Sequence, residues 1–144
     1  MPAPANKRLL TDILRTQWGF DGYVVSDVGG VADIYQQNRH AYVPTAVEAS
    51  ALAVKSGNEL DSGTTFGGAR GGQSNLAQSV QEGLINEKEI DTGLGRLMEA
   101  RLRLGEFDPC GFAGNPYNKI TTKMYNTEEN HALHLRRHAK RWCC

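Results

Sequence analysis

The sequence has no excess of either charge, since sixteen Lys and Arg residues balance sixteen Asp and Glu residues over 144 positions. A chain without net charge lacks the basic field that attracts nucleic acids or anionic membranes, so neither is expected as a partner. No apolar run approaches the roughly 20 residues of a membrane-spanning helix. Cysteine is scarce as well: Cys110, Cys143 and Cys144 are the only three. They build no disulfide framework.

Signals for a cofactor are also missing. The glycine-rich residues 63–72 lack the Lys-Ser or Lys-Thr pair of a phosphate-binding loop, and their spacing does not fit a dinucleotide fingerprint. A loop at the rim of a binding site is the better interpretation. Neither a cofactor nor a metal ion is expected.

What is present is a short apolar segment that ends in an acid. Residues 22–26 (Gly-Tyr-Val-Val-Ser) precede Asp27, a pattern that predicts a short buried strand. In α/β barrels catalytic groups lie at such strand ends. Apolar positions at helical spacing in residues 9–14 predict a helix upstream, with Asn6 as its cap and Gly19 as its stop. Asp27 is therefore a candidate catalytic residue, although an Asp here can also simply cap the next turn.

Further helices are predicted downstream. A capping box from Thr45 to Glu48 opens a helix that ends before Gly57, and residues 86–89 have a similar spacing. We expect the apolar faces of these helices to be core. Those faces include Leu76, Val80 and Leu84 in one stripe, and Ile90, Leu94, Leu97 and Met98 in another.

These segments together resemble the nucleophile region of the family 3 glycoside hydrolases, which are retaining β-glucosidases, β-xylosidases and their relatives. The resemblance covers residues 2–132 and is specific, because many separated positions agree in order. The positions that carry it are Ala5-Asn6-Lys7-Arg8-Leu9-Leu10-Thr11-Asp12-Ile13-Leu14-Arg15, Trp18-Gly19-Phe20, Gly22-Tyr23-Val24-Val25-Ser26-Asp27, Glu48-Ala49, Ala51-Leu52, Gly57, Leu60-Asp61, Glu82-Gly83, Ile90-Asp91, Arg96-Leu97, Leu104-Gly105 and Phe107-Asp108-Pro109.

The fold class implied is α/β, as part of a (β/α)8 TIM barrel. A complete barrel takes about 250 residues, so this length holds only its last two strands, near 23–26 and 59–61, with their flanking helices. Residues 1–109 would form the C-terminal portion of the barrel domain and 110–132 an interdomain linker. Family members are often secreted or periplasmic, but the N-terminus that would decide this is expected upstream of Met1.

The resemblance implies that Asp27 is the nucleophile of a retaining exo-acting β-glycosidase. A carboxylate at this position would capture the anomeric carbon of the sugar as a glycosyl ester. The general acid/base would lie on a second domain, so this chain alone is expected to be inactive. Asp61 ends the next strand and could form a carboxyl pair with Asp27, but a hydrogen-bonding role beneath the site is favoured. The alternative is a non-catalytic truncated product or a carbohydrate-binding remnant.

The substrate expectation follows from departures within the family pattern. The resemblance implies β-linked xylo- or gluco-oligosaccharides or aryl glycosides, hydrolysed at a terminal residue. Family β-glucosidases commonly place Trp after the nucleophile, whereas this chain has Val28, which favours a β-xyloside. Arg39 and His40 in the following loop are candidate substrate contacts, weighed against simple exposure. The oligomeric state does not follow from the sequence.

The last residues fit the family least well. His131, His134, His138 and Cys143 have a spacing that could imitate a zinc site, and the neighbouring basic residues could imitate a nucleic-acid-binding tail. Neither interpretation is favoured. Residues 139–144, translated in a shifted frame, can yield the Glu-Ala-x-Val-Leu run that family members have at this point. We therefore expect residues 133–144 to be a frameshifted tail.

Overall fold

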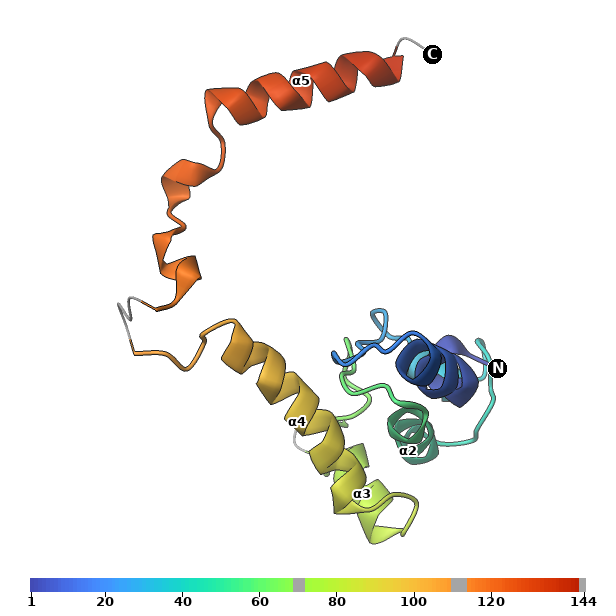
Figure 1. The fold of residues 1–144 in the computed structure, drawn as a ribbon. Coiled ribbons are helices and arrows are strands. Elements are labelled where there is room, and N and C mark those ends of the chain that lie inside the picture. Colours follow the sequence, from blue (N-terminus) through green and yellow to red (C-terminus); the bar gives the residue numbers. More distant parts are fainter. Residues whose placement is uncertain (69–71, 110–113, 143–144) are drawn as a thin grey trace. The chain divides into compact units, whose positions relative to one another are not determined.

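The computed structural model describes residues 1–68, 72–109 and 114–142, and for 139–142 the backbone only. It contains two compact units, Met1–Arg101 and Leu102–Cys144, which are considered separately (Figure 1). Across the described ranges no helix is long and apolar enough to cross a membrane. The elements are η1 (Ala3–Ala5), η2 (Arg8–Gln17), α1 (Ala32–Tyr35), α2 (Ala46–Ser56), α3 (Asn75–Gln81), α4 (Glu87–Arg103), η3 (Pro116–Lys119), η4 (Thr122–Met124) and α5 (Glu128–Trp142).

The helix predicted before Gly19 is present as η2, a π-helix rather than an α-helix. Trp18 donates its backbone N–H to the carbonyl of Ile13 at 3.0 Å, five residues back. The cap is confirmed, because the Asn6 side chain accepts the backbone N–H of Leu9 at 3.1 Å. Gly19 lies at φ +71°, the left-handed conformation that ends helices. An apolar stripe does not distinguish the two helix types, because both place residues three to five apart on one face.

The two predicted strands are reduced to one contact. Val25 and Leu60 form a parallel bridge, and the structure assigns no strand among the residues it describes. Ser26 donates to the carbonyl of Leu60 at 2.9 Å, and Leu60 donates to that of Val24 at 3.1 Å. The expected parallel pairing therefore exists only at this point. Two paired segments without further neighbours are marginal, since a stable sheet needs about three strands or a covering layer.

Helix α2 lies at the centre of the first unit. The capping box is confirmed, because Thr45 Oγ1 accepts the Glu48 N–H at 3.2 Å while the Glu48 carboxylate accepts the Thr45 N–H at 3.1 Å. Gly57 ends the helix at φ +96°. The apolar core on this helix is small: its buried members are Ala5, Val31, Ile34, Ala49 and Ala53.

Helix α3 joins this core through a buried serine. The Ser79 hydroxyl lies 2.9 Å from the carbonyl oxygen of Val47 in α2 and 2.7 Å from that of Asn75 in its own helix, so it can donate to either. The start of α4 is capped as predicted, since Asn86 Oδ1 accepts the Glu89 N–H at 3.1 Å. The core expectation for α4 is wrong, because none of its residues is buried and Leu94 is exposed. A helical stripe predicts which side chains share a face but not whether anything covers that face.

The second unit holds η3, η4 and α5. Helix α5 runs without interruption across position 133, where the frameshifted tail is expected to begin. Two short helices lie within the expected linker, of which residues 110–113 fall outside the described ranges. The domain boundaries and the tail therefore stay predictions.

Candidate active site

Asp27 follows the bridged segment directly and is exposed. Its Oδ1 accepts the backbone N–H of Val28 at 2.7 Å, and its carbonyl accepts the N–H of Gly30 at 2.8 Å. One carboxylate oxygen, Oδ1, thus has the local capping role that was the alternative to catalysis. Among the described residues Oδ2 has no hydrogen-bond partner, so one oxygen remains available for chemistry.

A pocket of about 290 Å³ adjoins this carboxylate. Asp27, Asp33 and His40 supply its titratable groups, while Leu10 and Val25 form part of its apolar wall. His40 reaches this wall because the chain turns back on α1: its N–H donates to the carbonyl of Asp33 at 3.1 Å. Next to it Ala41 adopts φ +44°, a conformation that L-residues other than Asn and Asp seldom take.

The other two candidate substrate contacts lie outside the lining of this pocket. Val28 is 81% exposed. Arg39 has a side chain that is 58% exposed and lies 3.7 Å from the Asp33 carboxylate. Of the sequence-predicted site residues, the structure therefore gathers Asp27 and His40 around one pocket and leaves Val28 and Arg39 beside it.

Asp61 is engaged in local hydrogen bonds. Its Oδ2 accepts the N–H of Thr65 at 2.6 Å and that of Phe66 at 3.2 Å, and its Oδ1 accepts the hydroxyl of Ser26 at 3.3 Å. Asp61 is half-buried, and both of its oxygens are occupied. These contacts agree with the favoured hydrogen-bonding role and distinguish Asp61 from Asp27.

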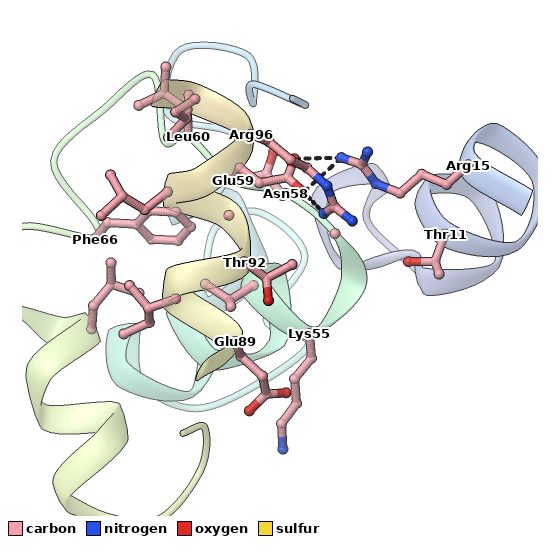
Figure 2. A pocket seen from close by; sticks show the side chains of 17 residues that line it. Thr11, Arg15, Lys55, Asn58, Glu59, Leu60, Phe66, Glu89, Thr92 and Arg96 are labelled. Atoms are coloured by element: carbon pink, nitrogen blue, oxygen red, sulfur yellow. Dashed lines mark hydrogen bonds and ion pairs between the residues drawn. The ribbon is translucent and has the colours of Figure 1, made fainter. Parts of the chain in front are cut away.

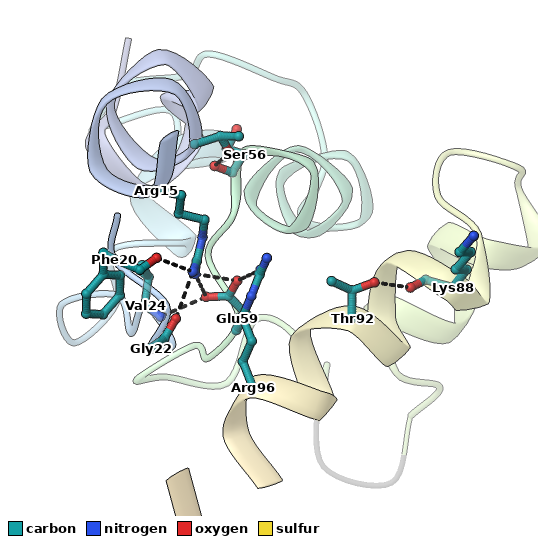
Figure 3. A network of polar contacts seen from close by, with 10 residues as sticks. Arg15, Phe20, Gly22, Val24, Ser56, Glu59, Lys88, Thr92 and Arg96 are labelled. Atoms are coloured by element: carbon teal, nitrogen blue, oxygen red, sulfur yellow. Dashed lines mark hydrogen bonds and ion pairs between the residues drawn. The ribbon is translucent and has the colours of Figure 1, made fainter. Parts of the chain in front are cut away.

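A charged network around Glu59 was not predicted from the sequence (Figure 3). The Glu59 carboxylate, only 4% exposed, accepts two hydrogen bonds of 2.7 Å from Arg15 Nη2 and one of 2.5 Å from Arg96 Nη1. Its Oε2 also accepts the backbone N–H of Val24 at 2.7 Å. One sequence feature could have indicated this network: Glu59 stands at the start of a predicted buried strand. A buried carboxylate needs a cationic partner, so an arginine beside it could have been expected.

A second and larger pocket, about 440 Å³, is lined by residues of α2 and α4 among others, and Asp27 is not part of its lining (Figure 2). Phe66 and Leu97 form part of its apolar wall, and Lys55 and Glu89 lie at its edge. Asn58 lines both pockets and is 1% exposed, yet neither polar atom of its side chain has a hydrogen-bond partner in the part of the chain that the structure describes. Size alone does not select this pocket, because it lacks the predicted nucleophile.

The imitated zinc site includes Cys143, so the structure describes it only in part. Within the described ranges no group of three or more His, Cys, Asp or Glu side chains is placed to hold a metal ion. His134 and His138 stack with ring centroids 5.5 Å apart, and Cys143 lies outside the described residues.

Comparison with known proteins points to a single family. Residues 1–100 match the model of the glycosyl hydrolase family 3 N terminal domain. A xylan 1,4-beta-xylosidase of Xylanibacter ruminicola is 35% identical over 125 residues, which is 85% of this chain and 14% of that protein. An exo-1,4-beta-xylosidase of Emericella nidulans is 38% identical over 136 residues, 92% of this chain and 16% of that protein.

Solved structures agree with this family. A family 3 exo-beta-xylosidase in complex with a xylobiose aziridine probe matches 84% of this chain and 15% of its own, with a TM-score of 0.71 and 29% identity. A beta-glucosidase from Listeria innocua in complex with isofagomine matches 92% of this chain and 17% of its own, with a TM-score of 0.74 and 28% identity. The chain thus spans about one seventh of the length of the proteins it resembles, and over that part its fold is similar to theirs.

Proposed function

The chain belongs to glycosyl hydrolase family 3, and from this premise we propose that it is the part of a retaining exo-acting β-glycosidase that carries the nucleophile, Asp27. The enzyme would hydrolyse terminal β-D-xylosyl or β-D-glucosyl residues. The observation that carries the proposal is the Asp27 carboxylate, which ends the bridged segment, adjoins a pocket and keeps one oxygen without a partner among the described residues.

The chemistry that we propose proceeds in two displacements. An oxygen of ionised Asp27 attacks the anomeric carbon and forms a glycosyl ester, while the bond to the leaving-group oxygen breaks and that oxygen takes a proton from a general acid. Water then attacks the same carbon and gives a proton to the former acid, now acting as base, while the ester bond to Asp27 breaks and the carboxylate is freed; two displacements retain the configuration. By the family resemblance the acid lies on a second domain beyond this chain.

We further propose that residues 1–109 supply the last two strands of a (β/α)8 barrel, followed by a linker at 110–132. The parallel pairing of Val25 with Leu60 supports this, since neighbouring barrel strands run parallel. The orphaned carboxamide of Asn58 supports it as well. Buried polar groups are nearly always paired in native proteins, which argues for further polar groups against this wall in the complete barrel.

A xyloside is the favoured substrate. Val28 stands where an aromatic residue would stack on a glucosyl ring, and its exposed side chain offers no such face. The curated relatives described above bear xylosidase names, although the solved structures include both xylosidases and glucosidases. His40 lies on the Asp27 pocket and is proposed as a contact to the sugar.

A second candidate is a non-catalytic product or a carbohydrate-binding remnant. Two observations favour it. The chain covers only 14% of the length of the Xylanibacter ruminicola relative, and the α4 side chains of Leu94 and Leu102 are exposed. The DNA on either side of the coding sequence separates the two candidates. Codons for earlier barrel strands and for a second domain support an enzyme, whereas their absence in every frame supports the second candidate.

The decisive experiment uses the full-length protein assembled from those flanking codons. It is incubated with 2-deoxy-2-fluoro-β-D-xylosyl fluoride, whose good leaving group allows a glycosyl ester to accumulate, and intact mass and peptide mapping locate the sugar. The ester is expected on Asp27. The Asp27→Asn variant should gain no mass. The Asp33→Asn variant, which changes another acid of the same pocket but keeps the nucleophile, should still carry the sugar on Asp27. A sugar attached to any other residue contradicts the proposal.

A further inference from the structure

The Glu59 carboxylate lies at the centre of an ion cluster with two arginines, and only one of those arginines reaches the segment that leads to Asp27. Arg15 donates from Nη1 to the carbonyl of Gly22 at 2.8 Å and more weakly to that of Phe20 at 3.5 Å (Figure 3). Its guanidinium carbon lies 5.6 Å from the centroid of the Phe20 ring. In the described part of the chain Arg96 has no contact of this kind and binds Glu59 alone.

Glu59 binds the same segment at Val24, closer to Asp27 along the chain. Its side chain accepts the N–H of Val24, while its own backbone N–H, together with that of Leu60, donates to the Val24 carbonyl at 3.0 and 3.1 Å. Both backbone polar groups of Val24 are therefore fixed by residues 59 and 60. Val24 stands three residues before Asp27, which corresponds to about 10 Å of extended chain.

The network acts on Asp27 through the backbone. In the described part of the chain no hydrogen bond or ion pair joins the Asp27 carboxylate to Glu59, Arg15 or Arg96, so an effect on its position passes along residues 24–27. A reacting group that is displaced by about 1 Å loses roughly a hundredfold in rate, because attack requires near-contact alignment.

We propose that Glu59 and Arg15 are positioning residues for Asp27. The Arg15 guanidinium holds the carbonyls of Phe20 and Gly22, and the Glu59 carboxylate holds the N–H of Val24. These contacts fix residues 20–24 and thereby set the direction in which the Asp27 side chain points. The catalytic consequence rests on the proposed function, whereas the positioning itself concerns the fold of this chain. Arg96 contributes charge to the cluster and no positioning.

The test compares two substitutions of the same kind, Arg15→Lys and Arg96→Lys, in the 144-residue chain. Each keeps a positive charge for Glu59 and loses a planar fork, but only Arg15→Lys removes the contacts to Gly22 and Phe20. Amide hydrogen exchange followed by NMR reports on Val24. The amide proton shift of Val28 reports on Asp27, whose Oδ1 accepts this N–H.

In Arg15→Lys the exchange of Val24 should rise about tenfold or more and the Val28 amide should shift, while protection in α2 stays within about twofold of the parent. In Arg96→Lys both reporters should stay unchanged. Equal effects of the two substitutions overturn the proposal, and so does a loss of protection throughout α2 in Arg15→Lys, because the arginine would then serve only the general stability of the fold. An unprotected Val24 amide in the parent chain also overturns it.

A second readout in the full-length enzyme measures the catalytic consequence. Arg15→Lys should lower kcat with KM unchanged, and Arg96→Lys should alter neither. If the parent enzyme forms no ester on Asp27, the proposed function fails while the exchange result still decides the positioning. A normal kcat in Arg15→Lys, measured in an enzyme that does form the ester, overturns the positioning role in catalysis.

Discussion

Val25 and Leu60 pair as a parallel bridge, which places the segment ending at Asp27 beside the segment ending at Asp61. The two acids then differ in their surroundings. Both side-chain oxygens of Asp61 accept local hydrogen bonds, whereas the side chain of Asp27 accepts only the N–H of Val28 among the described residues. Because the two acids lie on neighbouring segments but differ in their hydrogen bonds, we expect Asp27 to act in catalysis and Asp61 to support the structure.

Asp27→Ala should lower kcat of the full-length enzyme on an aryl β-xyloside by several orders of magnitude, because the variant lacks the attacking oxygen. Added azide or formate should partly restore turnover, since a small anion can occupy the vacated space. Asp61→Ala should instead lower the melting temperature, with no rescue by azide. Azide rescue of Asp61→Ala and none of Asp27→Ala would reverse the assignment.

The 144-residue chain by itself should hydrolyse neither aryl β-xyloside nor aryl β-glucoside above the buffer rate, because the proposed general acid lies outside it. Release of the aryl alcohol, followed by absorbance, measures this. Asp27→Ala in the same chain is the control. Hydrolysis that depends on Asp27 would show that a group within the chain serves as the acid, with Asp61 and His40 the first to examine.

Gly57→Ala should destabilise the first unit by about 1–2 kcal/mol, because the residue lies at φ +96° and an added Cβ would come within 3.1 Å of Thr11 Oγ1. Gly95→Ala is the matched control. Gly95 lies inside α4 with open space around it, so the same change should stabilise by about 1 kcal/mol through helix propensity. Urea unfolding followed by circular dichroism measures both, and equal effects would contradict the assigned backbone conformations.

Thr45→Ala should cost about 0.5–2 kcal/mol, because it removes the hydroxyl of the capping box at the start of α2. Thr121 precedes η4 and makes no capping hydrogen bond through its side chain in the described structure. Thr121→Ala should therefore leave the free energy of unfolding unchanged. Thermal melts of the two variants beside the parent chain give the comparison.

Ser79→Ala should cost about 1 kcal/mol, because the buried hydroxyl can donate to the Val47 carbonyl of α2 as well as to the Asn75 carbonyl of its own helix, and the variant leaves the Val47 carbonyl without this donor. Ser50 is equally buried, but its hydroxyl donates only to Ala46 within the same helix. Ser50→Ala should be nearly neutral, since such backward bonds within a helix add little stability. A larger loss for Ser50→Ala, measured by urea unfolding, would contradict the role given to Ser79.

Local features of this protein could be predicted from its sequence. The Asn6 cap, the box at Thr45 and Glu48, and the helix ends at Gly19 and Gly57 were predicted, because each depends on a few neighbouring residues. The family could be identified from the order of short motifs along the sequence, because matching such motifs does not require knowing how the chain folds in space.

Apart from the expected pairing of the segments around Val25 and Leu60, only the tertiary structure decided which distant residues meet. An acid at the start of an apolar segment has the same pattern whether it is exposed or buried, so only the fold placed Glu59 between Arg15 and Arg96. Only the fold brought His40 to the pocket of Asp27 and left Val28 outside its lining. It also left α4 without a buried residue despite its apolar stripe. Periodicity and caps are short-range signals, whereas burial and charge pairing depend on what the rest of the chain places opposite each side chain.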